Sequence, residues 1–276
     1  MKVFVTGASG YIGRATVAAL RRHGHVVEAL ARTDVSAAAV SEAGATPVRG
    51  GLADLDVLAG AARRADAVIH LAQADSGEAD LAAATAMLGH GTYVHTGGTW
   101  VYGDTNGIAD EDAPWNPPAL VAWREEVELK VLAAGGVVIR PGLLYGRENR
   151  LIDVFFTRPG KASGAIPYIG DGANHWSLVH VDDLADLYVK ALDAKPGSVY
   201  VGVGGVDPTA LDIATAISHG AGLEGRTVAL SLAEARAQMG PIADAFALDQ
   251  RFTPARAQAE LGWAPRHTDP LAEFRG

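Results

Sequence analysis

Short apolar runs alternate with amphipathic stretches along the first half of the chain. Runs of apolar and β-branched residues predict six strands, at residues 3–6, 25–31, 46–49, 67–71, 92–96 and 137–140. Apolar residues at helical spacing predict helices at residues 11–23, 54–62, 79–90 and 121–134, with Asp54 capping the second and Gly135-Gly136 ending the fourth. Because short buried strands that alternate with helices form parallel sheets covered on both faces, the pattern predicts an α/β fold with a doubly wound parallel sheet.

The pattern changes after residue 140. Residues 141–175 are rich in glycine, proline and aromatic residues and have no clear period. The rest predicts a helix at 182–194, a strand at 199–203, a helix opened by Asp207-Pro208 that runs to about 219, a helix with the capping box Ser231…Glu234, and a helix at 253–261. We therefore predict a large domain at 1–150, to which 176–195 return, and a small C-terminal α/β lobe formed by 151–175 and 196–276.

A glycine motif joins the first predicted strand to the first helix. Gly7, Gly10 and Gly13 have GxxGxxG spacing, and Ser9, Tyr11 and Ile12 stand between them. The first glycine permits a sharp turn, the second a close approach to a pyrophosphate, and the third close packing of helix on strand. Free N–H groups at the helix start then attract phosphates, whereas the alternative is a turn without a ligand. The motif predicts a Rossmann-type domain that binds a nicotinamide cofactor.

Composition narrows the classes of partner. The 276 residues carry a formal net charge of −9, with a pI near 5.4, which argues against nucleic acid and anionic membranes as partners. The chain has no cysteine, and its nine histidines lack metal-ligand spacing, so we predict neither disulfides nor a metal site. Because no apolar run reaches membrane-spanning length and the N-terminus does not read as a signal peptide, we expect a cytoplasmic protein with a small-molecule substrate.

Further strings point to a known family. They are Val68-Ile-His-Leu-Ala72, Trp100-Val-Tyr-Gly103, Val138-Ile-Arg-Pro-Gly142 with Tyr145-Gly146, and Val179-His-Val-Asp-Asp-Leu-Ala185. Together with the glycine motif they resemble the extended short-chain dehydrogenase/reductase superfamily, in its NAD-dependent epimerase/dehydratase group. The resemblance covers nearly the whole chain. It implies a Rossmann domain, a bound NAD(P) and a small C-terminal substrate lobe.

The chain departs from this family where the chemistry occurs. The family usually carries a Ser or Thr and a Tyr-x-x-x-Lys pair, but no Tyr-x-x-x-Lys string exists in this sequence. In the family a glutamate usually follows the lysine by four places. If Glu128 is that glutamate, Arg124 stands at the lysine position and Leu120 at the tyrosine position. Counting three places back from Val101 puts Gly98 at the Ser/Thr position. An arginine can still hold a ribose, but its pKa above about 12 prevents it from shuttling protons at neutral pH.

The end of the second strand indicates the cofactor. The family usually has an acidic residue there that binds the ribose 2′-hydroxyl of NAD, and here Ala31 and Arg32 occupy that place. Arg32, with Arg14 after the last glycine, can pair with a 2′-phosphate, so we favour NADP over NAD; the alternative for both arginines is a solvated surface position. By position in the family pattern, three residues flank the adenine or its ribose and three lie near the nicotinamide: Leu52, Leu71 and Ala72, and Thr96, Pro141 and Leu143.

The sequence leaves the identity of the catalytic groups undecided. Thr99, Tyr102 and Arg124 are the candidates, because each can donate a hydrogen bond to a substrate oxygen. The alternatives are a loop hydroxyl for Thr99 and a packing role for Tyr102. Tyr145 and His175 are further possible acids, each with a structural alternative, and Trp100, Trp115, Trp123 and Trp176 can form either a substrate wall or core.

Two functions compete. The first is an NADP-dependent reductase or dehydrogenase of a small, apolar carbonyl or enone metabolite that uses a non-standard proton donor. The second is a non-redox protein that binds NAD(P). It is either a regulator that senses the cofactor, or a cyclase or isomerase that uses the pocket without net redox chemistry. The intact glycine motif favours the enzyme. By the same family resemblance, we expect a homodimer through the helices near 79–90 and 121–134.

Overall fold

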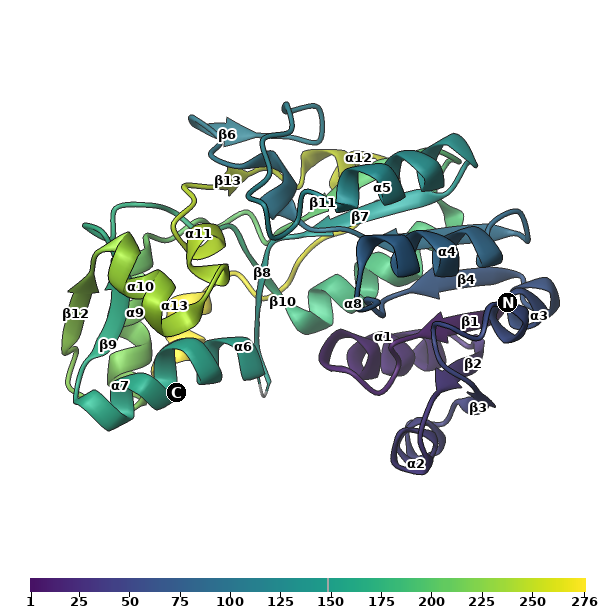
Figure 1. The fold of residues 1–276 in the computed structure, drawn as a ribbon, viewed down its shortest axis with the longest axis horizontal. Helices are drawn as coiled ribbons and strands as arrows, with labels where there is room; N and C mark the ends of the chain where they lie inside the picture. Colours follow the sequence, from purple (N-terminus) through teal and green to yellow (C-terminus); the bar gives the residue numbers. More distant parts are fainter. Residues whose placement is uncertain (148) are drawn as a thin grey trace.

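The computed structural model describes residues 1–147 and 149–276, in which a central sheet carries helices on both faces and a smaller lobe lies beside it (Figure 1). All pairings in the central sheet are parallel, in the order β11-β7-β5-β4-β1-β2-β3. Its seven strands are β1 (Lys2–Thr6), β2 (Val26–Ala31), β3 (Thr46–Arg49), β4 (Ala67–His70), β5 (Thr92–Thr96), β7 (Val137–Pro141) and β11 (Val199–Gly202). The predicted doubly wound α/β fold is confirmed.

Two layers of helices cover this sheet. The helices are α1 (Tyr11–Arg22), α2 (Asp34–Glu42), α3 (Leu55–Arg64), α4 (Gly77–Met87), α5 (Arg124–Ala133), α8 (Val181–Lys190) and α12 (Ala255–Leu261), with short 3-10 turns η1 (Thr99–Tyr102) and η3 (Ala191–Asp193). On one face α1 packs against α8 around Leu20, Leu184 and Tyr188. On the other face α3, α4 and α5 cover Phe4 and Val68. The strands are therefore buried on both sides, as their continuous apolar runs require.

The strand order reverses direction between β1 and β4. From β1 the chain first builds outward through β2 and β3, and it then returns to place β4 on the opposite side of β1. The ends of β1 and β4 lie side by side. A Cβ atom at Gly7, just after β1, would be only 2.8 Å from the backbone nitrogen of Ala72, just after β4. In open α/β sheets the crevice beyond the carboxyl ends at such a reversal is where ligands bind.

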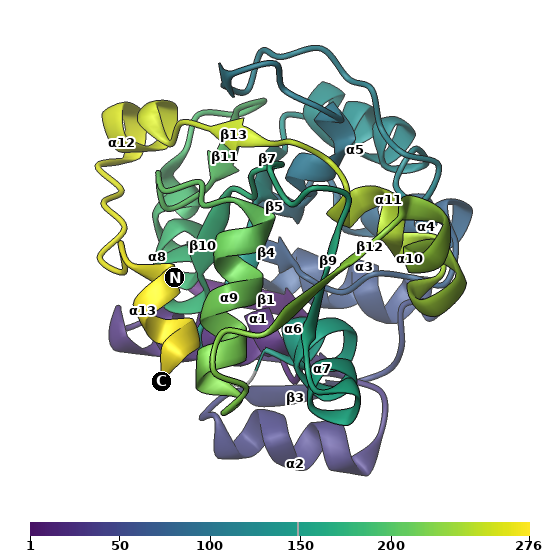
Figure 2. The ribbon, with the colours of Figure 1, turned by 90° about the vertical axis from the view of Figure 1, so that its left-hand side faces the viewer.

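The smaller lobe has its own core. It contains two strand pairs, β8 (Leu143–Tyr145) with β10 (Leu178–His180) and β9 (Ile166–Ile169) with β12 (Thr227–Leu230). Its helices are α6 (Arg150–Ile152), the π-helix η2 (Asp153–Thr157), α7 (Arg158–Ser163), α9 (Ala210–Gly220), α10 (Leu232–Met239), α11 (Ile242–Phe246) and α13 (Pro270–Arg275). Figure 2 shows α9, β9 and β12 in front of the main sheet. Phe156, Trp176 and Phe246 pack together at the centre of this lobe.

The small lobe was predicted to consist of residues 151–175 and 196–276, and the structure shows that the start of the second segment at residue 196 is wrong. The predicted strand there is β11, which pairs with β7 and closes the main sheet instead of joining the lobe. The adjacent α12 packs against β11, and a further short pair, β6 (Ile108–Ala109) with β13 (Arg251–Phe252), lies close by. Local sequence carries no signal for this choice, because β11 finds its partner about 60 residues away along the chain.

Several predicted boundaries also change. Helix α5 begins at Arg124 because Val121 lies in a preceding turn, where its N–H bonds to the Pro118 carbonyl. Helix α9 begins two residues later than predicted: Thr209 caps it, and Asp207 instead accepts a hydrogen bond from the Ser177 hydroxyl. Asp54 precedes α3 but does not cap it, because its carboxylate accepts the N–H of Gly51.

Candidate active site

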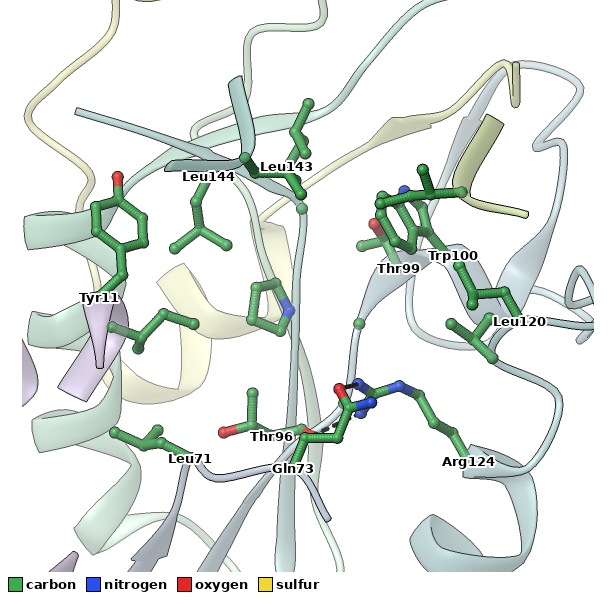
Figure 3. Close-up of a pocket in the computed structure, with 18 of the residues that line it drawn as sticks. Tyr11, Leu71, Gln73, Thr96, Thr99, Trp100, Leu120, Arg124, Leu143 and Leu144 are labelled. Carbon is green, nitrogen blue, oxygen red and sulfur yellow. Dashed lines mark hydrogen bonds between the residues drawn. The ribbon is translucent and has the colours of Figure 1, made fainter. Parts of the chain in front are cut away.

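A cavity of about 450 Å³ opens beyond the carboxyl ends of β1, β4, β5 and β7 (Figure 3). Main-sheet loops form its floor, and residues of the smaller lobe close it from above. Its walls are predominantly apolar. The lining residues are Tyr11, Ile12, Leu71, Ala72, Gln73, Asp80, Thr96, Gly97, Gly98, Thr99, Trp100, Leu120, Val121, Trp123, Arg124, Pro141, Gly142, Leu143, Leu144, Asn149, Leu151 and Ile242.

Tyr11 and Ile12, which follow Gly10 in the glycine turn, line one end of this cavity. Gly7 adopts a φ of +70°, and the N–H of Gly10 closes the turn onto the Gly7 carbonyl at 2.9 Å. A Cβ atom at Gly13 would come within 2.0 Å of the same carbonyl, so only glycine permits this contact between helix and strand. The exposed Gly10 and half-buried Ser9 leave the start of α1 open, and the first turn of that helix carries no acidic residue. This cradle fits a dinucleotide pyrophosphate, which Tyr11 and Ile12 would meet through their backbone N–H groups.

The adenosine end lies beyond β2. Arg32 is exposed, and its side chain passes beside Gly51, where a Cβ atom would lie 3.5 Å from the arginine Cδ. Leu52 follows and packs at the margin of the helix-covered face. Glu28 forms an ion pair with Lys2 at 2.8 Å and stands too early in β2 to reach a ribose at the end of that strand.

Arg14 points away from this end. Its guanidinium contacts the Ser9 carbonyl at 3.5 Å, and it lines a second cavity together with Gly146 and Arg147. A position beside the 2′-phosphate would require the side chain to leave that cavity. Of the two arginines predicted to meet a 2′-phosphate, Arg32 is therefore the one that lies at the end of β2.

The three positions that depart from the family pattern converge on the main cavity. Gly98, Leu120 and Arg124 all line it, although they come from the loop after β5, the segment before α5, and the start of α5. Figure 3 shows Arg124 reaching from α5 toward Gln73 and Thr96, with Leu120 on the same side of the cavity. Its guanidinium donates to the Thr96 carbonyl at 3.2 Å and to the Gln73 side-chain oxygen at 3.0 Å. Burial lowers the pKa of Arg124, opposed by the carboxylates of Glu128 and Asp80.

Thr96 and Thr99 both line this cavity. The Thr96 hydroxyl shares a hydrogen bond of 2.8 Å with the hydroxyl of the buried Tyr188 on α8, which fixes its direction. Thr99 is nearly buried and lines the cavity, and its carbonyl accepts the side-chain amide of Gln250 at 2.8 Å. The structure thus brings two of the three predicted catalytic residues, Thr99 and Arg124, to one cavity.

The third predicted catalytic residue, Tyr102, does not fit that role. It is 2% exposed and lies outside the cavity lining, and its hydroxyl donates to the Glu111 carbonyl at 3.0 Å while accepting from Arg140. Burial raises its pKa to about 12, against the opposing charge of Arg140. Arg140 forms a buried ion pair with Glu128 at 2.8 Å. Tyr102 therefore belongs to a polar network that joins η1 and β7 to α5.

The other possible acids are engaged elsewhere. The Tyr145 hydroxyl donates to the His267 carbonyl at 2.7 Å, and burial raises its pKa. His175 lies outside the cavity lining, where its Nδ1 is 2.8 Å from the carboxylate of Asp249. Trp100 and Trp123 line the cavity, whereas Trp115 stacks on Arg140 at 4.6 Å and Trp176 is buried in the small lobe.

Comparison with known proteins agrees with this geometry. Residues 3–202 match the NAD dependent epimerase/dehydratase family. The chain belongs to that family. A protein of Saccharomyces cerevisiae, uncharacterized protein YLL056C, is 32% identical over 100% of this chain and 98% of its own.

Two further proteins that this family member resembles are a reductase and a dehydratase. The 3-diazoavenalumate denitrifying reductase of a Streptomyces species is 28% identical over 97% of each chain. The crystal structure of the dTDP-glucose 4,6-dehydratase DesIV from Streptomyces venezuelae, with NAD and TYD bound, superposes with a TM-score of 0.82 at 22% identity, over 100% of this chain and 96% of that one. The resemblance to that structure shows a shared fold.

Sequence reasoning missed several lining residues of this family member. Gln73 directly follows Leu71 and Ala72, which were predicted to contact the cofactor, so its position in the sequence could have indicated that it lines the cavity. Asp80 reaches the cavity from α4, and its carboxylate accepts the N–H of Ala74 at 2.9 Å. Leu144, Asn149, Leu151 and Ile242 come from the small lobe, whose placement the sequence does not encode locally.

Within residues 1–147 and 149–276, none of the helices is both long and apolar enough to cross a membrane.

Proposed function

We propose that this protein is an NADP-dependent reductase or dehydrogenase of a small, apolar carbonyl or enone compound. One observation carries the proposal: an apolar cavity begins at Tyr11 and Ile12, beside the glycine turn, and lies beyond the strand ends where the strand order reverses. Tyr11, Ile12, Leu71 and Ala72 line the end near the turn, and Trp100, Leu120 and Trp123 line the far end. This arrangement supports a cofactor and a second, apolar molecule in one continuous space.

The choice of NADP is supported by the end of β2. Ala31 stands where a carboxylate would repel a 2′-phosphate, and the exposed Arg32 next to it can pair with that phosphate in a bidentate contact. Gly51 leaves room for the Arg32 side chain, because a Cβ atom there would meet it at van der Waals distance.

The residues at the far end support polarisation of a carbonyl. A bound nicotinamide supplies or accepts the hydride. Arg124 and Thr99 can donate hydrogen bonds to the substrate oxygen, which strengthen as negative charge develops on it. In the reduction, the carbonyl carbon gains the hydride and its oxygen gains a proton from water that enters through the cavity mouth. Neither protein group needs to lose a proton in this scheme.

Tyr11 is an unsuitable proton donor. Its hydroxyl lines the cavity but is shared between the carbonyls of Tyr145 and Gly146, and burial raises its pKa. We therefore expect the rate to follow the positioning of Arg124 and Thr99 and not the titration of a tyrosine.

Transfer of deuterium tests the proposal. NADPH deuterated at C4, prepared separately on each face of the ring, is mixed with the protein and a panel of apolar ketones and enones. Mass spectrometry should find the label in a reduced product for one of the two faces. We expect Thr99→Ala with Arg124→Gln to lower the rate at least a hundredfold, and the exposed variant Arg63→Gln to leave it unchanged. Tight NADPH binding without transfer to any compound would instead favour a non-redox role for the cofactor.

A further inference from the structure

Arg124 is a cation in the cavity wall whose hydrogen bonds go only to neutral oxygens. Both acceptors, the Thr96 carbonyl and the Gln73 amide oxygen, are uncharged. Among the residues that the structure describes, no carboxylate lies within ion-pair distance of its guanidinium, whereas the neighbouring Arg140 is paired with Glu128 at 2.8 Å. Of the two arginines at this edge of the sheet, one is neutralised by the protein and the other is not.

Neither nearby carboxylate forms an ion pair with Arg124. Glu128 accepts from Arg140 through Oε2, and its Oε1 has no hydrogen-bond partner among the described residues. Asp80 accepts the N–H of Ala74 and lies 3.9 Å from the imidazole of His70. Their charges favour the cationic form of Arg124 from a distance, but removal of water has the larger effect on its pKa. A half-buried cation without a contacting anion is a costly arrangement unless a ligand supplies the anion.

The guanidinium is also held in a fixed orientation. Its two bonds come from different nitrogens, Nη1 and Nη2, and the Trp123 ring lies 4.7 Å from its central carbon. Because a guanidinium has five N–H donors, further donors remain for a ligand. Figure 3 shows this group between the polar Thr96 and Gln73 below and the apolar Leu120 and Trp100 above.

We propose that the substrate is an organic anion with an apolar body. Its carboxylate pairs with Arg124, and its hydrocarbon part lies against Leu120 and Trp100. The inference deepens the proposed function and rests on it for the reacting carbonyl or alkene. The free N–H donors of Arg124 then bind the carboxylate in place of the reacting oxygen, to which Thr99 remains the donor. An apolar oxo acid or unsaturated acid combines these features. Gln73 is then a positioning residue, because it fixes the plane of the guanidinium without touching the carboxylate.

Matched neutral and anionic probes test this assignment. Calorimetric titrations compare trans-cinnamate with trans-cinnamamide, and octanoate with octanamide, on the protein saturated with NADPH and on the protein alone. Each amide has nearly the shape of its acid but lacks the charge. The variants are Arg124→Gln, Arg124→Lys and Gln73→Leu, with the exposed Arg63→Gln as a control of equal charge change. The NADPH dissociation constant is measured for every variant.

The inference predicts at least tenfold tighter binding of each acid than of its amide. The preference should vanish in Arg124→Gln, persist in part in Arg124→Lys and Gln73→Leu, and stay intact in Arg63→Gln, while NADPH affinity changes less than threefold. Equal affinity for acid and amide, or no binding of either acid, overturns it. If Arg124→Gln weakens NADPH at least tenfold and keeps the preference, Arg124 serves the cofactor and the inference is wrong. If the wild type binds no NADPH, the proposed function fails, and the titrations without cofactor still decide the anion site.

Discussion

Two histidines behind the cavity, His70 and His95, are buried in their neutral forms. The Nδ1 atom of His70 is 2.7 Å from the Thr6 hydroxyl, and the two imidazole centres are 5.4 Å apart. Burial lowers the pKa of His70 to about 4, against the opposing charge of Asp80, and burial places the pKa of His95 well below its usual value. Neither ring nitrogen of His95 has a partner among the side chains that the structure describes.

These residues predict a loss of stability in mild acid. In the unfolded chain both histidines take up protons near pH 6.5, whereas in the folded state His70 resists protonation until about pH 4 and burial also lowers the pKa of His95. Their contribution to the free energy of unfolding should therefore be fully present above about pH 6.5 and fall as the pH drops toward 4. At pH 5 the loss from His70 should be about 2 kcal/mol, and His95 should add a loss of the same sign.

Urea unfolding at pH 7.5 and pH 5.0 measures this effect. His95→Phe removes one titrating ring and should lose less stability between the two pH values than the wild type does. The exposed variant His23→Gln should behave as the wild type. The same loss in His95→Phe and wild type would show that His95 is not held neutral.

At the scale of elements, the turn from β1 into α1 is the part of the site that local sequence specifies best. Gly7 is required by its positive φ and Gly13 by its close approach to the Gly7 carbonyl, all within thirteen residues, so the motif could be predicted. Helix α2 was missed for the opposite reason. Val40 is its one buried residue and Val35 is largely exposed, so its hydrophobic pattern is too weak to indicate a helix.

Gly13→Ala tests the turn. Because the new Cβ would lie 2.0 Å from the Gly7 carbonyl, α1 must move away from β1, and we expect stability to fall by about 1–3 kcal/mol and NADPH affinity at least tenfold. Gly60→Ala, inside α3, is the control. Its Cβ would meet only two flexible side chains, Arg64 at 3.4 Å and Arg63 at 3.8 Å, so this change should raise stability by about 0.5–1 kcal/mol. Normal NADPH binding by Gly13→Ala would contradict the assigned packing.

At the scale of the whole molecule, the C-terminal segment ties the small lobe to the main sheet. Trp263 is buried against the α1–α8 layer and donates to the Asp183 carbonyl at 2.9 Å, and the Asp183 carboxylate accepts the backbone N–H groups of Arg266 and His267. This connection holds the lobe where Leu151 and Ile242 complete the cavity. These residues could not be predicted as site residues, because only the packing of distant segments brings them to the strand ends.

The predicted homodimer also belongs to this scale. Helices α4 and α5 pack side by side on one face, and Leu129 on α5 is 58% exposed there. We expect light scattering after gel filtration to give twice the chain mass of 28.6 kDa. A charge at the centre of the interface should separate the protomers, so Leu129→Glu should give a mass of one chain. A single-chain mass for the wild type would refute the dimer.

The most direct measurement is a parallel titration of the wild type and Arg32→Ala with NADPH and NADH, followed by nucleotide fluorescence. We predict that the wild type binds NADPH at least tenfold tighter than NADH. Arg32→Ala should lose most of that preference, because only NADPH carries the 2′-phosphate, and it should keep its affinity for NADH. Failure of the wild type to bind either nucleotide would contradict a working cofactor site at the glycine turn. An unchanged preference in Arg32→Ala would contradict the role assigned to that arginine.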